Sequence, residues 1–215
     1  EYLDYFKKEV IEELISKGGA TCKFYEGAYG AGKTHILLLL KKLSFDCNMA
    51  VASIDLSQAL SLTDWRLITE YILQNLEAKI DGQIVRSLPE ILAAWGKKNI
   101  GSNIEVLKGE WLPSSGFKKA MIYATQREGL NDLAWEVLKQ YLLGRRISTA
   151  ILQRNDFIGI KGYLTQRNAE YVLKTVLGGL YYLGFTGTTL LFDENEKTLV
   201  GSSRIISKKN KIAAN

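Results

Sequence analysis

Eight consecutive residues near the start of the chain have the types and spacing of a phosphate-binding loop. They read Gly27-Ala28-Tyr29-Gly30-Ala31-Gly32-Lys33-Thr34, the pattern G-x-x-x-x-G-K-T. Glycines let the backbone approach phosphate oxygens without a Cβ in the way. Lys33 is placed to reach the β- and γ-phosphates of a nucleotide, and the Thr34 hydroxyl to ligate Mg²⁺. The pattern predicts a nucleoside triphosphate site; the alternative is a glycine-rich turn that only resembles one.

The sequence on both sides of the loop supports a binding site. Residues 20–25 form a short β-prone run that we expect to be the first strand of a sheet. Residues 35–43 form an apolar run that predicts a helix. A strand, a glycine loop and a helix in this order surround one anion with backbone N–H groups and a positive helix end.

A second stretch, residues 188–194, supplies acids that fit the loop. It reads Thr-Thr-Leu-Leu-Phe-Asp-Glu, an apolar strand that ends in two carboxylates, as a Walker B strand does. We predict that Asp193 holds Mg²⁺ through its water shell and that Glu194 orients and deprotonates the attacking water. Buried strands often end in acids, so this stretch indicates a Walker B strand only in combination with the glycine loop. Glu194, and the absence of an N-K-x-D element, favour ATP hydrolysis over GTP chemistry.

Three residues near the predicted site have two interpretations each. We count the stretch Gly27 to His35 as contacting the nucleotide, but for His35 a packing role is favoured over that of a catalytic base. Tyr29 contacts the nucleotide or a neighbouring subunit. Alternatively, it packs against a strand residue such as Phe24. Asp55 ends a predicted strand, residues 49–56, and serves the site or caps a loop.

The remaining segments predict an α/β fold in which helices flank a parallel sheet, with a large and mostly helical insertion. Residues 1–17 have the apolar stripe of an amphipathic helix, and Thr63-Asp64 starts another helix. We divide the chain into residues 1–80, the first half of an ATPase core; 81–167, the helical insertion; and 168–215, the second half with the acidic strand. Within the insertion, residues 114–116 are predicted to be a linker.

Composition limits the classes of function. The chain has 215 residues and a net charge of +5 from 28 basic and 23 acidic residues. Four of the bases lie between residues 201 and 215 without an acid, so the rest is nearly neutral and gives no strong nucleic-acid signature. Cys22 and Cys47 have neither disulfide-framework nor zinc-site spacing, and we expect a reduced, cytoplasmic protein with no membrane segment. Arg145, Arg146, Arg154 and Arg167 indicate either solvated helix ends or a contact with nucleic acid or a partner.

These motifs, taken with three further pieces of sequence, resemble one known family. The pieces are Ile54-Asp55-Leu56-Ser57, the helix start at Asn168-Ala169 with Gly178-Gly179-Leu180, and Gly184-Phe185-Thr186-Gly187 before the acidic strand. Together they resemble the ATP-binding proteins of the BREX phage-defence system, which are AAA+-like P-loop proteins. The resemblance implies ATP and Mg²⁺ as cofactors, and DNA, other defence proteins or further copies of the chain as partners. A family protein is expected to continue past Asn215 with a sensor strand and a trans-acting arginine.

Two functions are compatible with the sequence. The first is an Mg²⁺-dependent ATPase that couples turnover to remodelling of DNA or a partner protein, with Lys33 and Glu194 as its catalytic residues. The second is a nucleotide-gated binding module with little hydrolysis of its own. A DNA-binding adaptor acting through the basic segment 207–211 ranks below both.

Overall fold

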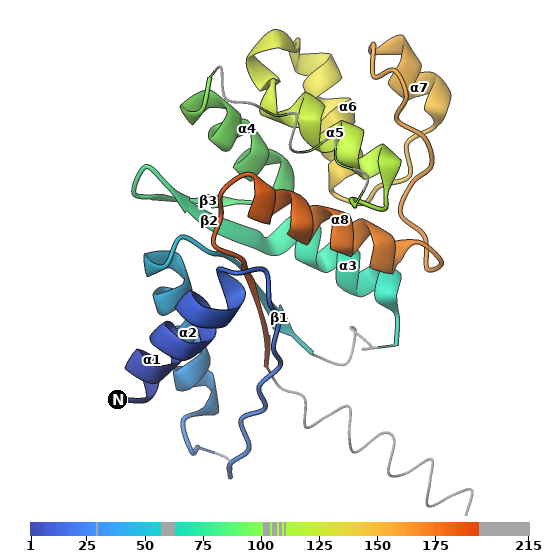
Figure 1. The fold of residues 1–215 in the computed structure, drawn as a ribbon. Helices are drawn as coiled ribbons and strands as arrows, with labels where there is room; N and C mark the ends of the chain where they lie inside the picture. The colour runs from blue at the N-terminus through green and yellow to red at the C-terminus, as the bar shows by residue number, and fades with distance from the viewer. Residues whose placement is uncertain are drawn as a thin grey trace, which may run out of the picture.

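The computed structural model describes residues 1–28, 30–56, 63–100, 104, 107, 109 and 111–193. These residues form an α/β fold in which helices lie on both faces of a four-stranded sheet (Figure 1). In chain order the helices and strands are α1 (Tyr2–Tyr5), the π-helix η1 (Phe6–Ile15), α2 (Lys33–Asp46), β1 (Ala50–Asp55), α3 (Trp65–Asn75), β2 (Leu76–Ile80), β3 (Gln83–Arg86), α4 (Leu88–Lys98), α5 (Ser115–Thr125), the 3₁₀ helix η3 (Arg127–Gly129), α6 (Asp132–Leu142), α7 (Thr149–Arg154), α8 (Ala169–Tyr182) and β4 (Thr188–Asp193).

The sheet is mixed, and the expectation of a parallel sheet is correct only for the pair β1–β4. The strand order is β3-β2-β1-β4, with β1 parallel to β4 and antiparallel to β2. Strands β2 and β3 form a hairpin, and β3 lies in the region, residues 81–167, that was predicted to be mostly helical. Asp81 and Gly82 connect them with φ angles of 50° and 79°, as a two-residue type I′ turn requires.

The strand predicted at residues 20–25 is absent, and that prediction was wrong. The chain from Ala20 to Ala28 runs without regular structure, and Cys22, expected in a buried strand, is exposed. Phe24 is 86% exposed. A β-prone run becomes a strand only where its backbone pairs with a neighbour, and the described ladder of β4 is with β1.

Other predicted elements were confirmed with small shifts of their ends. The N-terminal helix has α-helical geometry in α1 and π-helical geometry in η1, and it buries Val10 and Ile11. Asp64 caps α3 by accepting a hydrogen bond from the Leu67 N–H at 3.0 Å.

The predicted linker at residues 114–116 is instead the start of α5. Gly116 is buried there against the Lys161 carbonyl and the Tyr141 hydroxyl, which leave no room for a side chain.

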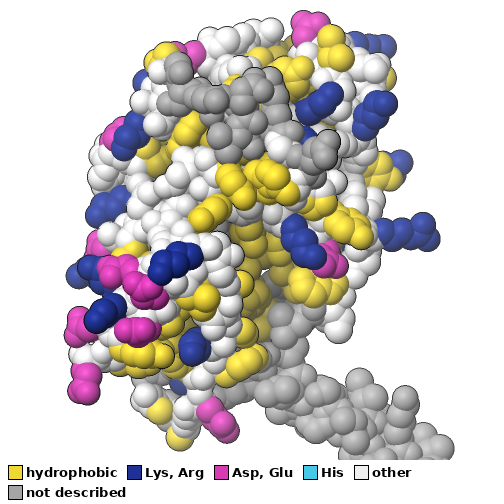
Figure 2. All heavy atoms as spheres, in the orientation of Figure 1, with side chains coloured by type: hydrophobic (Ala, Val, Ile, Leu, Met, Phe, Trp, Pro, Cys, Tyr) yellow, Lys and Arg dark blue, Asp and Glu magenta, His cyan; other side chains and the backbone are white. Residues whose placement is uncertain are grey.

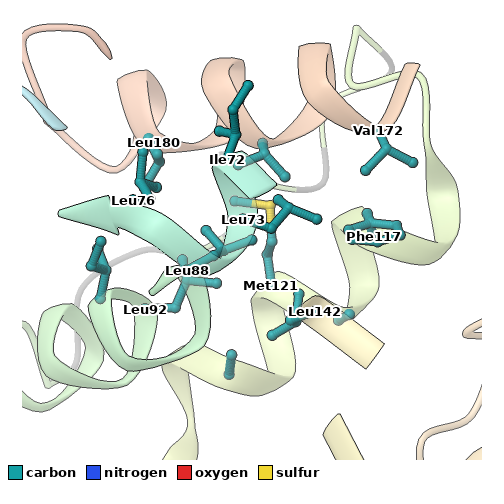
Figure 3. Close-up of a cluster of buried hydrophobic side chains, with 14 of the residues drawn as sticks. Ile72, Leu73, Leu76, Leu88, Leu92, Phe117, Met121, Leu142, Val172 and Leu180 are labelled. Carbon is teal, nitrogen blue, oxygen red and sulfur yellow. The ribbon is translucent and has the colours of Figure 1, made fainter. Parts of the chain in front are cut away.

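Alternation along β1 and β4 divides the interior into two clusters, one on each face of the sheet. Ala50, Ala52 and Ile54 face the larger cluster, which α3 to α8 complete. Figure 3 shows the centre of that cluster, where Leu73, Met121 and Leu180 converge from three helices. Because this one cluster contains β1 and residues 81–167 together, the helical region packs directly on the sheet. The three-part domain division stays a prediction.

The smaller cluster holds α1 and α2 against the opposite face of the sheet. Its buried members are Leu40 of α2, Val51 of β1 and Leu191 of β4. Around it pack Leu3, Phe6, Tyr25, Ile36, Leu37 and Phe45. Figure 2 shows basic and acidic side chains interleaved over the N-terminal helices, consistent with ion pairs such as Lys17–Glu13. The charge on this surface is therefore balanced locally.

Two polar contacts fix the position of α2 on the sheet. The buried Ser44 hydroxyl donates to the Leu40 carbonyl at 2.8 Å and lies 2.9 Å from the Thr189 hydroxyl of β4. Lys41 pairs with Glu77 of β2 at 2.8 Å, with both side chains largely buried. Because α2 begins directly after the glycine loop, these contacts also determine where the loop lies.

We predict that the Ser44–Thr189 contact contributes a measurable coupling energy. A double-mutant cycle with Ser44→Ala, Thr189→Val and the double variant should give about 0.5–1.5 kcal/mol in the free energy of unfolding, measured by urea denaturation. Strictly additive effects of the two substitutions would show that the hydroxyls do not hold α2 to β4.

A second prediction concerns the packing of α4 on α5. A Cβ on Gly96 would lie 1.8 Å from the Thr125 carbonyl oxygen, so the two helices must separate if a side chain is added. Gly96→Ala should lower the free energy of unfolding by about 1–3 kcal/mol or more in urea. Gly129→Ala is the matched control, because nothing lies within 4 Å of its Cβ position. Equal stability of the two variants would contradict the close approach of α4 and α5.

Candidate functional site

Two of the three loop glycines, Gly30 and Gly32, have a left-handed backbone conformation. Gly30 and Gly32 have φ angles of 81° and 86°, in the left-handed region that favours glycine. The Ala31 N–H donates to the Ala28 carbonyl at 3.1 Å, which closes a turn. Helix α2 then begins at Lys33, so its first N–H groups open toward the loop. Tyr29 lies outside the described residues.

The Lys33 side chain folds back over the loop. Its Nζ donates to the Gly27 carbonyl at 2.7 Å and to the Ala28 carbonyl at 3.3 Å. The ammonium group is thereby placed above the loop backbone. A cation and a set of helix-terminal N–H groups share one small region, which is the combination that binds phosphate groups.

The loop and the acidic strand meet through one hydrogen bond. The Thr34 hydroxyl donates to the Asp193 carboxylate at 3.0 Å, although the two residues are 159 positions apart in the sequence. Asp193 is the last residue of β4, and it lies opposite Asp55, the last residue of β1. The Leu56 N–H donates to the Asp193 carbonyl at 3.1 Å and fixes the end of the pairing. Glu194 lies outside the described residues.

An open cavity of about 320 Å³ adjoins the loop. It combines loop residues with aromatic and aliphatic side chains: Tyr2, Tyr25, Glu26, Ala31, Gly32, Lys33 and Ile36. The hydroxyls of Tyr2 and Tyr25 are hydrogen-bonded to each other. Burial, together with this hydrogen bond, raises the pKa of Tyr25 above its ordinary value.

Sequence reasoning did not name either tyrosine as a site residue. It placed Tyr2 in the apolar stripe of a helix and Tyr25 in a strand. The one available signal was their nearness to the loop, Tyr25 being two residues before Gly27. The distance between Tyr2 and the loop along the chain hides their contact.

Other residues singled out in the sequence lie elsewhere or make contacts within the chain. His35 is exposed on the first turn of α2. Arg145 pairs with the nearly buried Glu70 at 2.6 Å, and the Arg146 guanidinium lies 4.9 Å from the centre of the Tyr163 ring. The basic residues between 201 and 215 are outside the described residues.

The oxygens that meet at the end of β4 fit Mg²⁺. A hydroxyl and a carboxylate are hard ligands of the kind this ion prefers, and Mg²⁺ usually takes one or two protein oxygens and fills its shell with phosphates and water. Among the described residues, no three His, Cys, Asp or Glu side chains gather as a metal site. Thr34 and Asp193 therefore suit an ion that arrives with a phosphate ligand.

No helix in the described ranges is long and apolar enough to cross a membrane. Comparison with protein-family models finds a match over part of the chain. Neither the curated proteins nor the solved structures contain a match to it. The family model described as "BREX system ATP-binding protein BrxC/D" matches residues 4–108, which include the glycine loop, α2 and β1. The family recognised from the sequence, the BREX system ATP-binding proteins, is therefore confirmed over residues 4–108.

Proposed function

We propose that this protein is an Mg²⁺-dependent P-loop ATPase of the AAA+-like type that acts in phage defence. The observation that carries the proposal is the hydrogen bond between Thr34 and Asp193. A phosphate-binding loop and an acidic strand remote from each other in the sequence meet at the point where ATP and Mg²⁺ would have to be held together. The description of the matching family, which names ATP binding, supports the choice of nucleotide.

In this proposal each part of the loop has a distinct task. The N–H groups that follow Gly30 and Gly32 bind the phosphate oxygens, and Lys33 exchanges the Gly27 and Ala28 carbonyls for the β- and γ-phosphates. Because Lys33 already lies over the loop, little reorganisation is needed. Thr34 and Asp193 would hold the Mg²⁺ ion, and the ion would supply positive charge beside the phosphates.

Glu194 is the proposed group that orients and deprotonates the attacking water. This role rests on the sequence, where Glu194 follows Asp193 at the end of an apolar strand. A carboxylate at this place can accept the proton from the water as it attacks the γ-phosphate.

The energy of ATP turnover is proposed to act on DNA or on other proteins of the defence system. The helical region from α4 to α7 is the candidate transmitter, because its core is continuous with β1, and β1 ends beside Asp193. A nucleotide-gated module that binds ATP without turnover is the other function that the sequence allows. The two functions share the binding site and differ only in hydrolysis.

Loss of the lysine tests whether the loop is the ATP site. Lys33→Ala should weaken Mg²⁺-ATP binding by at least about tenfold in calorimetric titration, because a charge-assisted hydrogen bond to phosphate is removed. Lys42→Ala is the matched control, an exposed lysine on the same helix, and its affinity should stay within about twofold of the unaltered chain. Unchanged affinity in Lys33→Ala would place ATP elsewhere.

Hydrolysis is tested separately through the proposed base. Glu194→Gln should keep ATP affinity and slow phosphate release by about 10²–10⁴-fold, since the proton acceptor is lost while the shape is kept. Glu196→Gln, two residues along, is the control and should turn over normally. The measurement is steady-state phosphate release with and without DNA and partner proteins. Saturable binding with no turnover under any of these conditions would favour the gated module over the ATPase.

A further inference from the structure

A second open cavity, of about 440 Å³, lies between α5 and the segment that joins α7 to α8. That segment runs beside α5 (Figure 1), and the Tyr123 hydroxyl of α5 donates to the Ile158 carbonyl at 3.4 Å. The cavity is lined by Lys118, Lys119, Ile122, Tyr123 and Ile158. Helix α5 packs in the larger hydrophobic cluster, whereas α2 packs in the smaller one on the opposite face of the sheet. The cavity is therefore separate from the proposed ATP site.

Beside this cavity, a lysine lies over a turn that contains two glycines. Gly159 and Gly162 have φ angles of 83° and 77°, in the left-handed region that favours glycine. A side chain at Gly159 would collide with the Lys119 ammonium group, which therefore lies over the turn. Lys161, between the two glycines, is exposed, and no described atom lies within 4 Å of the Cβ position of Gly162. As at the phosphate-binding loop, a cation and closely approachable backbone lie together, which suits an anionic ligand.

Aromatic rings accompany these cations. The half-buried Tyr123 ring packs against the buried Phe157 ring, with 5.1 Å between the centres and 69° between the planes, so its position is fixed. Ile158, which also lines the cavity, is 73% exposed. Farther along the same segment, the Arg146 guanidinium lies 4.9 Å from the centre of the Tyr163 ring. Tyrosine rings and arginine planes are surfaces on which an unpaired base stacks.

The charge in these parts of the chain is strongly one-sided. Helix α5 contains two lysines and no acid, and residues 143–168 contain five bases and one acid. The bases of that segment are Arg145, Arg146, Arg154, Lys161 and Arg167, and the acid is Asp156. Only Arg145 is paired with a nearly buried acid, Glu70 of α3. Because the chain before residue 201 is nearly neutral in total, its other parts must be net acidic. The neutral total thus conceals a basic region around the cavity.

A ligand that matches this region carries repeated negative charge together with flat groups. Inorganic phosphate would use the lysines alone, and an acidic protein segment would bring carboxylates without a row of flat groups. A nucleic acid has both, and only an unpaired strand can turn a base toward a ring, because the bases of a duplex stack on one another.

We propose that the cavity between α5 and the turn at residues 157–162 binds single-stranded nucleic acid. Lys119 and Lys161 contact the phosphates, and a base stacks on Tyr123. This site goes beyond the proposed ATPase and needs no ATP at the glycine loop, so either assignment can fail without the other.

The test measures binding of fluorescently labelled oligothymidine and oligouridine, each of about 12 nucleotides, to the full chain by anisotropy without ATP. At least one of them should bind, and the one bound more tightly identifies the sugar. Lys119→Gln and Lys161→Gln should each weaken binding and lower the slope of log affinity against log salt by about 0.7. Lys42→Gln, an exposed lysine on the opposite face of the sheet, is the matched control and should leave the slope unchanged.

The stacking contact is tested at the ring. Tyr123→Leu should weaken binding by about tenfold, because the base loses its platform, while the salt slope stays the same. Tyr123→Phe keeps the ring and should bind within about twofold of the unaltered chain. Thermal denaturation verifies that each variant is folded, and the exposed lysines carry the test if Tyr123→Leu is not.

Four results would overturn the proposal. The first is an unaltered chain that binds neither oligonucleotide. The second is binding that the lysine and leucine substitutions leave unchanged, which would place the nucleic acid elsewhere, for example on residues 201–215. The third is equal affinity for a duplex of the same length. The fourth is equal affinity for polyglutamate, which would identify the region as a site for an acidic protein segment.

Discussion

The parallel pairing of β1 with β4 is the constraint on which the rest of the structure depends. It places Asp193 level with Asp55 and within hydrogen-bonding distance of Thr34. The chain between these two strands contains most of the helices, so the pairing closes a long loop of chain. Parallel neighbours need such a crossover, whereas β2 and β3 are joined by a two-residue turn. The site is thus assembled by tertiary structure and not by any local segment.

Two hydrophobic clusters of unequal size hold that pairing from opposite faces. The larger one packs α3 and α8 against β1 and extends through α4 to α7, so that it supports one face of the sheet. The smaller one holds α1, α2 and the residues before the loop. The residues that flank the glycine loop therefore lie in the thinner layer. Polar contacts such as Ser44–Thr189 and Lys41–Glu77 give this layer a defined position over the end of β4.

Sequence reasoning predicted the elements whose signals are local. The loop motif, the helix after it, the Asp64 cap and the strands β1 and β4 follow from patterns within a few residues, and each was found close to its predicted position. The hairpin β2–β3 was missed although Asp81-Gly82 is a strong hairpin signal, because residues 81–167 were predicted to be mostly helical. Residues 20–25 look like a strand, but a strand depends on a pairing partner elsewhere in the chain. The Tyr2–Tyr25 contact is equally non-local, and nothing in the spacing of the two tyrosines reveals it.

The central claim is that Thr34 and Asp193 mark the place where a metal ion and the phosphates of ATP are held together. The most direct measurement is a crystal structure of the chain with Mn²⁺ and a non-hydrolysable ATP analogue, in which anomalous scattering locates the metal. The account predicts one anomalous peak between the Thr34 hydroxyl and the Asp193 carboxylate, with the phosphates enclosed by the loop and Lys33. A metal peak away from these two side chains, or phosphates bound outside the loop, would contradict it.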